Sequence, residues 1–196
     1  KEYFNDKVYK SFIKRNVRII AERLLVNQTK ANITVSLASH KTGKKLLNTP
    51  NPVIIPNGVD TIKFNHCTKG NLTKADLGIP RNRTLFGFIA RLCQQKDPLT
   101  LLKGFRAALS TDHNLHLLIV GEGNLKKDCI KSIEDLKLEA HVTYLPYVED
   151  VTEVLSILDV YCLPSKWENL PFGILEAMAM KKAVIATPEE GITEVI

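Results

Sequence analysis

The sequence predicts an α/β fold, in which a Rossmann-like parallel sheet is flanked by helices. From residue 85 onward, short apolar segments alternate with longer segments of helical periodicity. Such apolar runs are typical of strands buried on both faces, and the helices between them supply the crossovers that parallel strands need. The predicted strands are Leu85–Ile89, His116–Val120, Val142–Leu145, Val160–Leu163 and Ala183–Ala186, and the predicted helices are Pro98–Ser110, Leu125–Leu136, Val151–Leu158, Phe172–Met180 and one that begins within Thr193–Ile196.

The first 83 residues lack this regular alternation. A long segment with apolar residues at helical spacing comes first, and two short apolar segments then flank a second helix candidate. Asn57-Gly58 is typical of a turn, because both residues tolerate positive φ. The predicted elements are a helix over residues 7–30, a strand Ile33–Ser36, a helix capped by Ser39 and running to Leu47, a strand Val53–Ile55, and a short helix Lys74–Leu77 within a loop over residues 61–83.

The net charge of +6 is concentrated at the N-terminal end. Residues 1–31 carry eight Lys and Arg against three Asp and Glu, so the rest of the chain is nearly neutral. This distribution argues against nucleic-acid binding. Apolar residues interleave with the charges, and two interpretations stay open: a core-facing helix with a solvated basic face, which we favour, or a basic amphipathic helix lying on an anionic membrane.

Several classes of protein are excluded by what the sequence lacks. The four cysteines stand far apart, so we expect free thiols in a reducing cytoplasm and no metal site. The motifs of serine hydrolases, P-loop nucleotide hydrolases and zinc proteases are absent. No apolar run is long enough to cross a bilayer, and we interpret the start at Lys1 as the sign of a fragment.

The most informative segment is residues 168–176, Glu-Asn-Leu-Pro-Phe-Gly-Ile-Leu-Glu. Pro171 fits the first turn of a helix, so Glu168 lies in the preceding loop and Glu176 lies within the helix. Unpaired N–H groups at a helix start can hold a phosphate, and carboxylates accept hydrogen bonds from hydroxyls. N–H groups that can bind a phosphate, next to carboxylates that can bind hydroxyls, predict the binding of a sugar nucleotide.

Residues that follow the predicted strands should gather on one rim, because ligands of parallel sheets bind outside the carboxyl ends of the strands. Arg91 and Lys96 suit a diphosphate there, although such a pair alone is more often ordinary surface charge. For Gly121-Glu122-Gly123 we favour a tight strand-to-helix turn over an incomplete dinucleotide fingerprint. The expected rim residues are Arg91, Gly121, Tyr147, Ser165 and Thr187.

Taken in order, these motifs resemble the family 4 retaining glycosyltransferases of the GT-B fold. The resemblance extends over roughly residues 53–196, and its signature is the pair of glutamates with seven residues between them. The blocks that carry it are Asn57-Gly58-Val59-Asp60, Ile89-Ala90-Arg91-Leu92 with Lys96, Ile119-Val120-Gly121-Glu122-Gly123, Pro164-Ser165 with Glu168, Gly173 and Glu176-Ala177-Met178-Ala179, and Ala183–Thr187 with Gly191 and Glu194.

The resemblance implies one half of a two-domain GT-B enzyme, truncated at both ends. Residues 1–56 would be the C-terminal remnant of the acceptor-binding domain with the interdomain connection, and residues 57–196 an incomplete donor-binding, Rossmann-like domain. The enzyme would transfer a sugar from a nucleotide-sugar donor to a glycan or lipid-linked acceptor with retention of anomeric configuration, and would need no metal or other cofactor. The fragment alone would bind the donor and be inactive.

The same resemblance implies roles for single residues. Two cations would hold the donor diphosphate and neutralise the leaving nucleotide, one glutamate would contact the transferred sugar, and the other would contact the ribose hydroxyls. The helix start would offer backbone N–H groups to sugar and phosphate. The implied catalytic residues are Glu168, Arg91 and Lys96, and the implied donor-binding residues are Arg91, Lys96, Glu168, Asn169, Phe172, Gly173, Ile174 and Glu176.

Asn169 departs from the family pattern, which often has glycine there, so it is the first candidate for sugar specificity. A competing hypothesis is a catalytically inactive GT-B subunit that binds a nucleotide sugar or a partner, although the intact cations and glutamates argue against it. An epimerase, a phosphorylase and a Rossmann oxidoreductase are further alternatives. We expect a cytoplasmic protein, with peripheral contact at the inner face of the membrane through the basic N-terminal helix as an open question.

Overall fold

The computed structural model describes residues 12–50, 52–67 and 70–196, and the chain forms two compact units. The first unit comprises Lys1–Asn57, Trp167–Pro171 and Pro188–Ile196, and the second comprises Gly58–Lys166 and Phe172–Thr187. The division that the sequence predicts, after residue 56, assigns the two short later segments to the donor-binding domain instead. The chain therefore passes between the units four times, and three of these passages lie directly before, within and after the segment that carries the glutamate signature.

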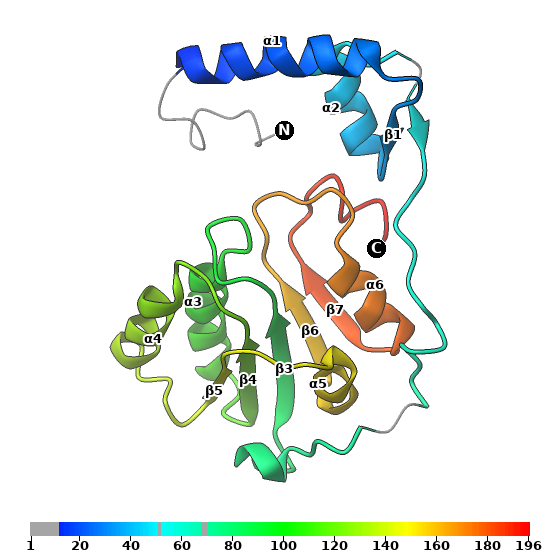
Figure 1. Ribbon diagram of the computed structural model, residues 1–196. Coiled ribbons are helices and arrows are strands. Elements are labelled where there is room, and N and C mark those ends of the chain that lie inside the picture. The colour runs from blue at the N-terminus through cyan, green and yellow to red at the C-terminus, as the bar shows by residue number, and fades with distance from the viewer. Residues whose placement is uncertain (1–11, 51, 68–69) are drawn as a thin grey trace. The chain divides into compact units, whose positions relative to one another are not determined.

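The second unit is built on a five-stranded parallel sheet with the order β5-β4-β3-β6-β7 (Figure 1). Its strand order reverses at β3, which has β4 on one side and β6 on the other, and such a switch point is where open α/β sheets bind ligands. The predicted α/β architecture is thereby confirmed. The strands are β3 (Thr84–Ile89), β4 (Leu115–Val120), β5 (Val142–Leu145), β6 (Val160–Leu163) and β7 (Ala183–Ala186).

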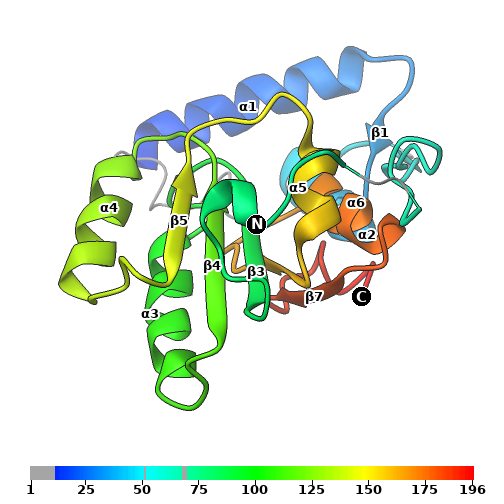
Figure 2. The ribbon, with the colours of Figure 1, turned by 90° about the horizontal axis from the view of Figure 1, so that it is seen from below.

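Helices lie on both faces of this sheet (Figure 2). On one face, apolar side chains of β4 pack with Leu102, Phe105 and Leu109 of one helix and Cys129 of the next, which gives a buried hydrophobic cluster. The inner strand β4 is buried along its whole length, as its apolar sequence predicts. The helices are α3 (Pro98–Leu109), α4 (Lys126–Asp135), α5 (Val151–Ile157) and α6 (Phe172–Ala179), and the predicted short helix at residues 74–77 is a 3-10 turn, η1 (Ala75–Leu77).

Within its described residues, the first unit contains two helices and a two-stranded parallel sheet, in which Ile33 lies opposite Val53. The prediction that Ser39 caps the second helix is wrong, because the helix begins at Leu37 and Ser36 is its N-cap. Ser36 is extended at φ −157°, and its hydroxyl oxygen accepts a hydrogen bond from the Ser39 N–H. Ser36 is therefore the capping residue, and Ser39 lies in the first turn that it caps. The elements are α1 (Phe12–Gln28), β1 (Ile33–Thr34), α2 (Leu37–Leu47) and β2 (Val53–Ile54).

The C-terminal residues 188–196 belong to the first unit and do not form the predicted helix. Residues 190–195 are successive turns, and their hydrogen bonds mix spacings of three and four residues, as at Val195 N to Ile192 O and Ile196 N to Ile192 O. The Glu194 carboxylate instead accepts the N–H groups of Leu37 and Ala38, each at 2.8 Å. It therefore satisfies free donors at the start of α2, where negative charge is stabilising.

The favoured core-facing interpretation of the N-terminal helix is not met in the described part of α1. Val17, Ile20, Leu24 and Leu25 are each more than half exposed, whereas Ile19 is buried. The first three lie at spacings of three and four residues and so share one face of the helix. The predicted start at residue 7 lies outside the described residues. Among the helices described, none is both long and apolar enough to cross a membrane.

Candidate functional site

The loop between β3 and α3, residues 90–97, holds the two predicted cations. It is a compact turn in which Cys93 N–H donates to Arg91 O at 2.9 Å, and Lys96 N–H donates to Cys93 O at 3.1 Å. Asp97 ends the turn in the left-handed conformation at φ 47°, and its carboxylate accepts the Thr100 hydroxyl at the start of α3. The exposed Arg91 and half-buried Lys96 thus lie just beyond the carboxyl end of β3, as the sequence predicts.

The glycine pair after β4 holds this loop in place. A Cβ at Gly121 would collide with the carbonyl oxygen of Ala90, and a Cβ at Gly123 would collide with the backbone of Leu92. Leu92 N–H donates to Glu122 O, and Leu125 N–H donates to Leu92 O, both at 2.9 Å. The tight strand-to-helix turn predicted at Gly121-Glu122-Gly123 is therefore present. Because the two glycines have no side chains, the Arg91 loop can lie against the backbone of the β4–α4 connection.

The end of β6 is joined to the same loop. Lys166 N–H donates to Gln95 O at 2.8 Å, and the Lys166 ammonium lies 3.3 Å from the buried Asp97 carboxylate. The neighbouring Ser165 is fully buried, and its hydroxyl has no hydrogen-bond partner. Its carbonyl accepts the Thr187 hydroxyl beyond β7. Three strand ends thus meet at one rim, as the parallel topology requires.

The start of α6 lies close to the ends of β3 and β6. A Cβ at Gly173 would collide with the Tyr161 hydroxyl, and that hydroxyl donates to Ile89 O at 3.3 Å. Ile174 is buried, whereas Phe172 is 54% exposed. The first N–H groups of a helix have no intrahelical acceptor. The N–H groups of Phe172, Gly173 and Ile174 therefore have no acceptor within α6, and they lie in the first turn of a helix that packs on the strand ends.

Glu176 lies one turn further along α6 and is half-buried. Burial raises the pKa of this carboxyl, and the ammonium of Lys63 partly opposes the shift. Lys63 comes from the loop after Asn57 and forms an ion pair of 3.5 Å with Asp150, the N-cap of α5. A partly dehydrated carboxylate of this kind gains more than a solvated one from hydroxyl donors.

Glu168 and Asn169 belong to the first unit rather than to the unit of the cations. Their loop lies against the C-terminal segment so closely that a Cβ at Gly191 would collide with the Asn169 carbonyl. Asn57 also holds the loop, since its side-chain amide donates to Leu170 O at 2.7 Å. The structure therefore gathers Arg91, Lys96 and Glu176 in one unit and places Glu168 in the other.

Sequence reasoning missed the residues that support these positions. Asp97 could have been predicted, because an aspartate directly before a proline is typical of the start of a helix. The other supporting residues make contacts between segments far apart in the chain, and such contacts leave no local sequence pattern. Tyr147, a predicted rim residue, is 76% exposed and makes no side-chain hydrogen bond within the described part of the chain. Among the described residues, no cluster of three or more His, Cys, Asp or Glu side chains could hold a metal ion. The missed supporting residues are Lys63, Asp97, Tyr161 and Lys166, and the contacts that Asn57 and Gly191 make with the Glu168 loop were also not predicted.

Comparison with known proteins identifies the family to which this arrangement belongs. The model of the family described as "Glycosyl transferases group 1" matches residues 71–196, well over half of the chain. The chain belongs to the group 1 glycosyl transferases. The matched region includes every residue of the predicted donor site, from Arg91 to Glu176.

Among curated group 1 relatives, a UDP-Gal:alpha-D-GlcNAc-diphosphoundecaprenol alpha-1,3-galactosyltransferase of Escherichia coli is 36% identical over 132 residues, covering 64% of this chain and 34% of the relative. The N-acetyl-alpha-D-glucosaminyl L-malate synthase of Bacillus anthracis is 29% identical over 123 residues, covering 63% of this chain and 32% of the relative. The chain therefore spans about a third of the length of these two relatives.

Solved structures share the fold. HepE of Anabaena, solved with UDP and glucose, has a TM-score of 0.78 at 22% identity, covering 91% of this chain and 51% of HepE. WaaG, described as a glycosyltransferase of lipopolysaccharide biosynthesis, has a TM-score of 0.73 at 18% identity, covering 83% of this chain and 46% of WaaG. These likenesses support the GT-B assignment of the group 1 fold, with this chain corresponding to part of each structure.

Proposed function

We propose that this chain supplies the donor site of a retaining glycosyltransferase, which transfers a sugar from a nucleotide sugar to a glycan or lipid-linked acceptor. The observation that carries the proposal is the grouping of Arg91, Lys96, the α6 start and Glu176 at the switch point of the second unit's sheet. Cations, helix N–H groups and a carboxylate complement the diphosphate and hydroxyls of such a donor.

The proposed chemistry assigns one task to each group. Arg91 and Lys96 neutralise the charge that develops on the diphosphate as the bond to the sugar breaks. Backbone N–H groups of Phe172, Gly173 and Ile174 bind phosphate and sugar oxygens, and Glu176 accepts hydrogen bonds from the ribose. The backbone of the loop that carries the two cations is fixed by hydrogen bonds before the donor arrives, so little reorganisation of the loop accompanies the reaction.

Glu168 and Asn169 are proposed to bind hydroxyls of the transferred sugar. Asn169 can both donate and accept hydrogen bonds, so its side chain can distinguish sugars that differ at one hydroxyl. Exchanging Asn169 for glycine would remove that discrimination, and we expect a broader donor preference rather than a loss of nucleotide binding.

A uridine diphosphate sugar is the first donor to test, because one relative is named as using UDP-Gal and HepE was solved with UDP. Calorimetry of this chain with UDP, GDP and ADP measures the preference directly. We expect binding of UDP, and at least tenfold weaker binding after Arg91→Ala or Lys96→Ala, because a charge-assisted hydrogen bond contributes about 1.5–3 kcal/mol.

Lys103→Ala is the matched control, since Lys103 is an exposed cation on α3. It should leave the affinity for the nucleotide unchanged. If none of the three nucleotides binds, or if Lys103→Ala weakens binding as much as Lys96→Ala does, the proposed donor site is wrong.

Because this chain spans about a third of the relatives named above, the transfer reaction is best tested in a protein that also contains an acceptor-binding domain. There we expect Glu168→Ala and Lys96→Ala each to lower turnover tenfold or more, and the product to keep the anomeric configuration of the donor by NMR. Turnover that persists in EDTA would support the proposed independence from metal. Donor binding without turnover on any acceptor would favour the competing hypothesis of an inactive binding subunit.

Peripheral membrane contact through α1 is proposed as an accompanying property. The exposed Val17, Ile20 and Leu24 share a face of a helix that also carries exposed Lys14 and Arg18. This composition suits the surface of an anionic membrane on the cytoplasmic side. The chain should sediment with vesicles containing anionic lipid, and Val17→Ser with Leu24→Ser should abolish this. Equal sedimentation with neutral vesicles would contradict the proposal.

A further inference from the structure

A buried carboxylate lies directly beside one of the two proposed diphosphate cations. Asp97 follows Lys96 in the chain and is buried. Its backbone has a φ of 47°, in the left-handed region that residues other than glycine seldom adopt. A buried carboxylate and a rare backbone conformation both cost free energy, so the contacts around Asp97 must hold it in place.

Asp97 is held by its own loop, by α3 and by the segment after β6. The Asp97 N–H donates to Cys93 O at 3.1 Å, which closes the turn from within. The carboxylate oxygen Oδ2 accepts the Thr100 hydroxyl at 2.8 Å, and the Lys166 ammonium lies 3.3 Å from the same oxygen. Of these partners only Lys166 carries a charge, so it alone offsets the charge of the buried carboxylate.

The backbone of Lys166 makes a second bond to the same loop. Its N–H donates to Gln95 O at 2.8 Å, so the main chain and the side chain of one residue hold positions 95 and 97. Lys96 lies between these positions, and its own N–H donates to Cys93 O at 3.1 Å. A residue just beyond the end of β6 therefore fixes both neighbours of Lys96.

The two members of the ion pair differ in burial, which decides the effect of removing either one. The side chain of Lys166 is 44% exposed, whereas that of Asp97 is 12% exposed. Loss of the lysine leaves a mostly dehydrated carboxylate without a cation, and the carboxylate gains free energy by moving toward water. That movement displaces the adjoining Lys96. An uncharged amide at position 97 still accepts the Thr100 hydroxyl and needs no cation.

We infer that Lys166 is a positioning residue for donor binding, which acts through Asp97 to fix the backbone on both sides of Lys96. Lys166 itself does not touch the donor. This inference rests on the proposed donor site, because it concerns how that site holds its diphosphate cation. It adds to the site a residue between β6 and the loop of Glu168.

Calorimetry of this chain with UDP tests the role of Lys166. Lys166→Met keeps an unbranched side chain and removes the charge, and we expect it to weaken UDP binding about fivefold, within the range of coupling between contacting residues. Measurement at a temperature where both proteins are folded keeps a change in stability from altering the affinity. Lys166→Arg, which also carries a cation, should restore most of the binding. An unchanged affinity of Lys166→Met would overturn the inference and leave the donor site standing.

A double variant separates positioning from direct contact with the donor. If Lys166 acts through Asp97, then Lys166→Met should change the UDP affinity less than twofold in a chain that already carries Asp97→Asn. A fivefold loss in both backgrounds would mean that the lysine binds the donor directly, and the inferred role would be wrong.

Hydrogen exchange reports on the loop without nucleotide. Lys166→Met should raise the exchange rate of the Lys96 and Asp97 N–H groups several-fold, because both groups are bonded within the turn. Weaker UDP binding without faster exchange would refute positioning. If the unsubstituted chain binds no nucleotide, the donor site itself is wrong, and faster exchange in Lys166→Met would then show that the ion pair is only structural.

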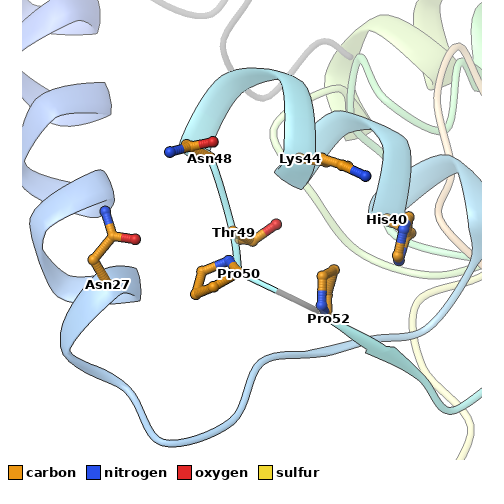
Figure 3. A pocket seen from close by; sticks show the side chains of 7 residues that line it. All are labelled: Asn27, His40, Lys44, Asn48, Thr49, Pro50 and Pro52. Carbon is orange, nitrogen blue, oxygen red and sulfur yellow. The ribbon is translucent and has the colours of Figure 1, made fainter.

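Lys44→Met is the matched control. Lys44 is an exposed lysine of the first unit, and it lines a polar pocket between α1 and α2 whose described lining residues include no carboxylate (Figure 3). The same substitution there should leave both the UDP affinity and the exchange of the loop unchanged. A loss of affinity equal to that of Lys166→Met would mean that any lost positive charge weakens binding, and would overturn the inference.

Discussion

At the scale of single residues, Glu176 shows how a binding group can oppose stability. Burial raises the pKa of its carboxyl, so the folded chain favours the protonated form more than the unfolded chain does. Between the ordinary pKa and the raised one, the folded state binds more protons, and the free energy of unfolding falls as pH rises through that window. The ionised form is nevertheless the better acceptor for ribose hydroxyls.

Glu176→Gln should therefore raise the stability of the chain at neutral pH and weaken nucleotide binding. The affinity of the unsubstituted chain should fall as pH drops through the raised pKa of Glu176, and the glutamine variant should lose this dependence. Urea unfolding and calorimetry at several pH values measure both effects. A variant that is less stable and binds nucleotide unchanged would show that Glu176 is structural.

The cysteines differ in reactivity because they differ in burial. Burial raises the pKa of the Cys129 thiol to about 11 and that of Cys162 to about 12, whereas Cys67 is exposed. Since the thiolate is the reactive form, Cys67 should react first with a thiol reagent at pH 8, and Cys129 and Cys162 only after unfolding. Mass spectrometry of the labelled peptides checks the order, and early labelling of Cys162 would contradict the buried strand β6.

At the scale of elements, the Gly121 and Gly123 pair couples the β4–α4 turn to the loop of the two cations. Gly121→Ala must place a Cβ on the Ala90 carbonyl at a φ of 144°, which side chains rarely adopt. We expect a loss of about 1–3 kcal/mol in unfolding free energy together with weaker nucleotide binding, since the Arg91 loop must move.

Gly104→Ala is the contrasting change, because a Cβ there meets no atom within 4 Å on α3. It should raise stability by about 0.5–1 kcal/mol and leave nucleotide binding unchanged. Denaturant unfolding of both variants decides the matter, and equal effects of the two substitutions would refute the coupling of the glycine turn to the loop.

The strands and helices of the second unit were predictable because each rests on a local pattern. The apolar run of β4 and the Pro98 and Pro171 starts of α3 and α6 are visible in the sequence alone. The Ser36 cap was missed because Ser36 and Ser39 are chemically equivalent, and only the Glu194 carboxylate at the α2 start distinguishes them. The positions of Arg91 and Lys96 beyond β3 were predictable from the strand end, and the position of Glu176 within α6 from the helix start at Pro171. The assignment of Glu168 to the first unit instead depends on contacts of its loop with Gly191 and Asn57, far away in the chain.

At the scale of the whole molecule, the two units are not consecutive pieces of sequence. The second unit contains all five strands of its sheet without residues 188–196, whereas the first unit includes them. A chain ending at residue 187 should keep the hydrogen-exchange protection of β3 to β7. It should lose protection in α2, because removing the Glu194 contacts costs about 0.5–2 kcal/mol, as for a helix cap.

Glu194→Ala should reproduce the faster exchange of α2 in the complete chain, whereas Glu189→Ala, on the same segment, should not. Mass spectrometry of exchanged peptides covering Leu37–Leu47 measures the difference. Unchanged protection in both the shortened chain and Glu194→Ala would mean that the carboxylate contributes nothing to the helix.

The bond between the start of α2 and Glu194 also bears on the order of events during synthesis. The two partners lie 157 residues apart in the chain. A ribosome releases α2 long before it adds the glutamate that caps it, and in that interval the sheet of the second unit can assemble from its nearer contacts. The start of α2 therefore reaches its final hydrogen bonding later than the sheet that follows it in the chain, and it must remain hydrated until Glu194 has been translated.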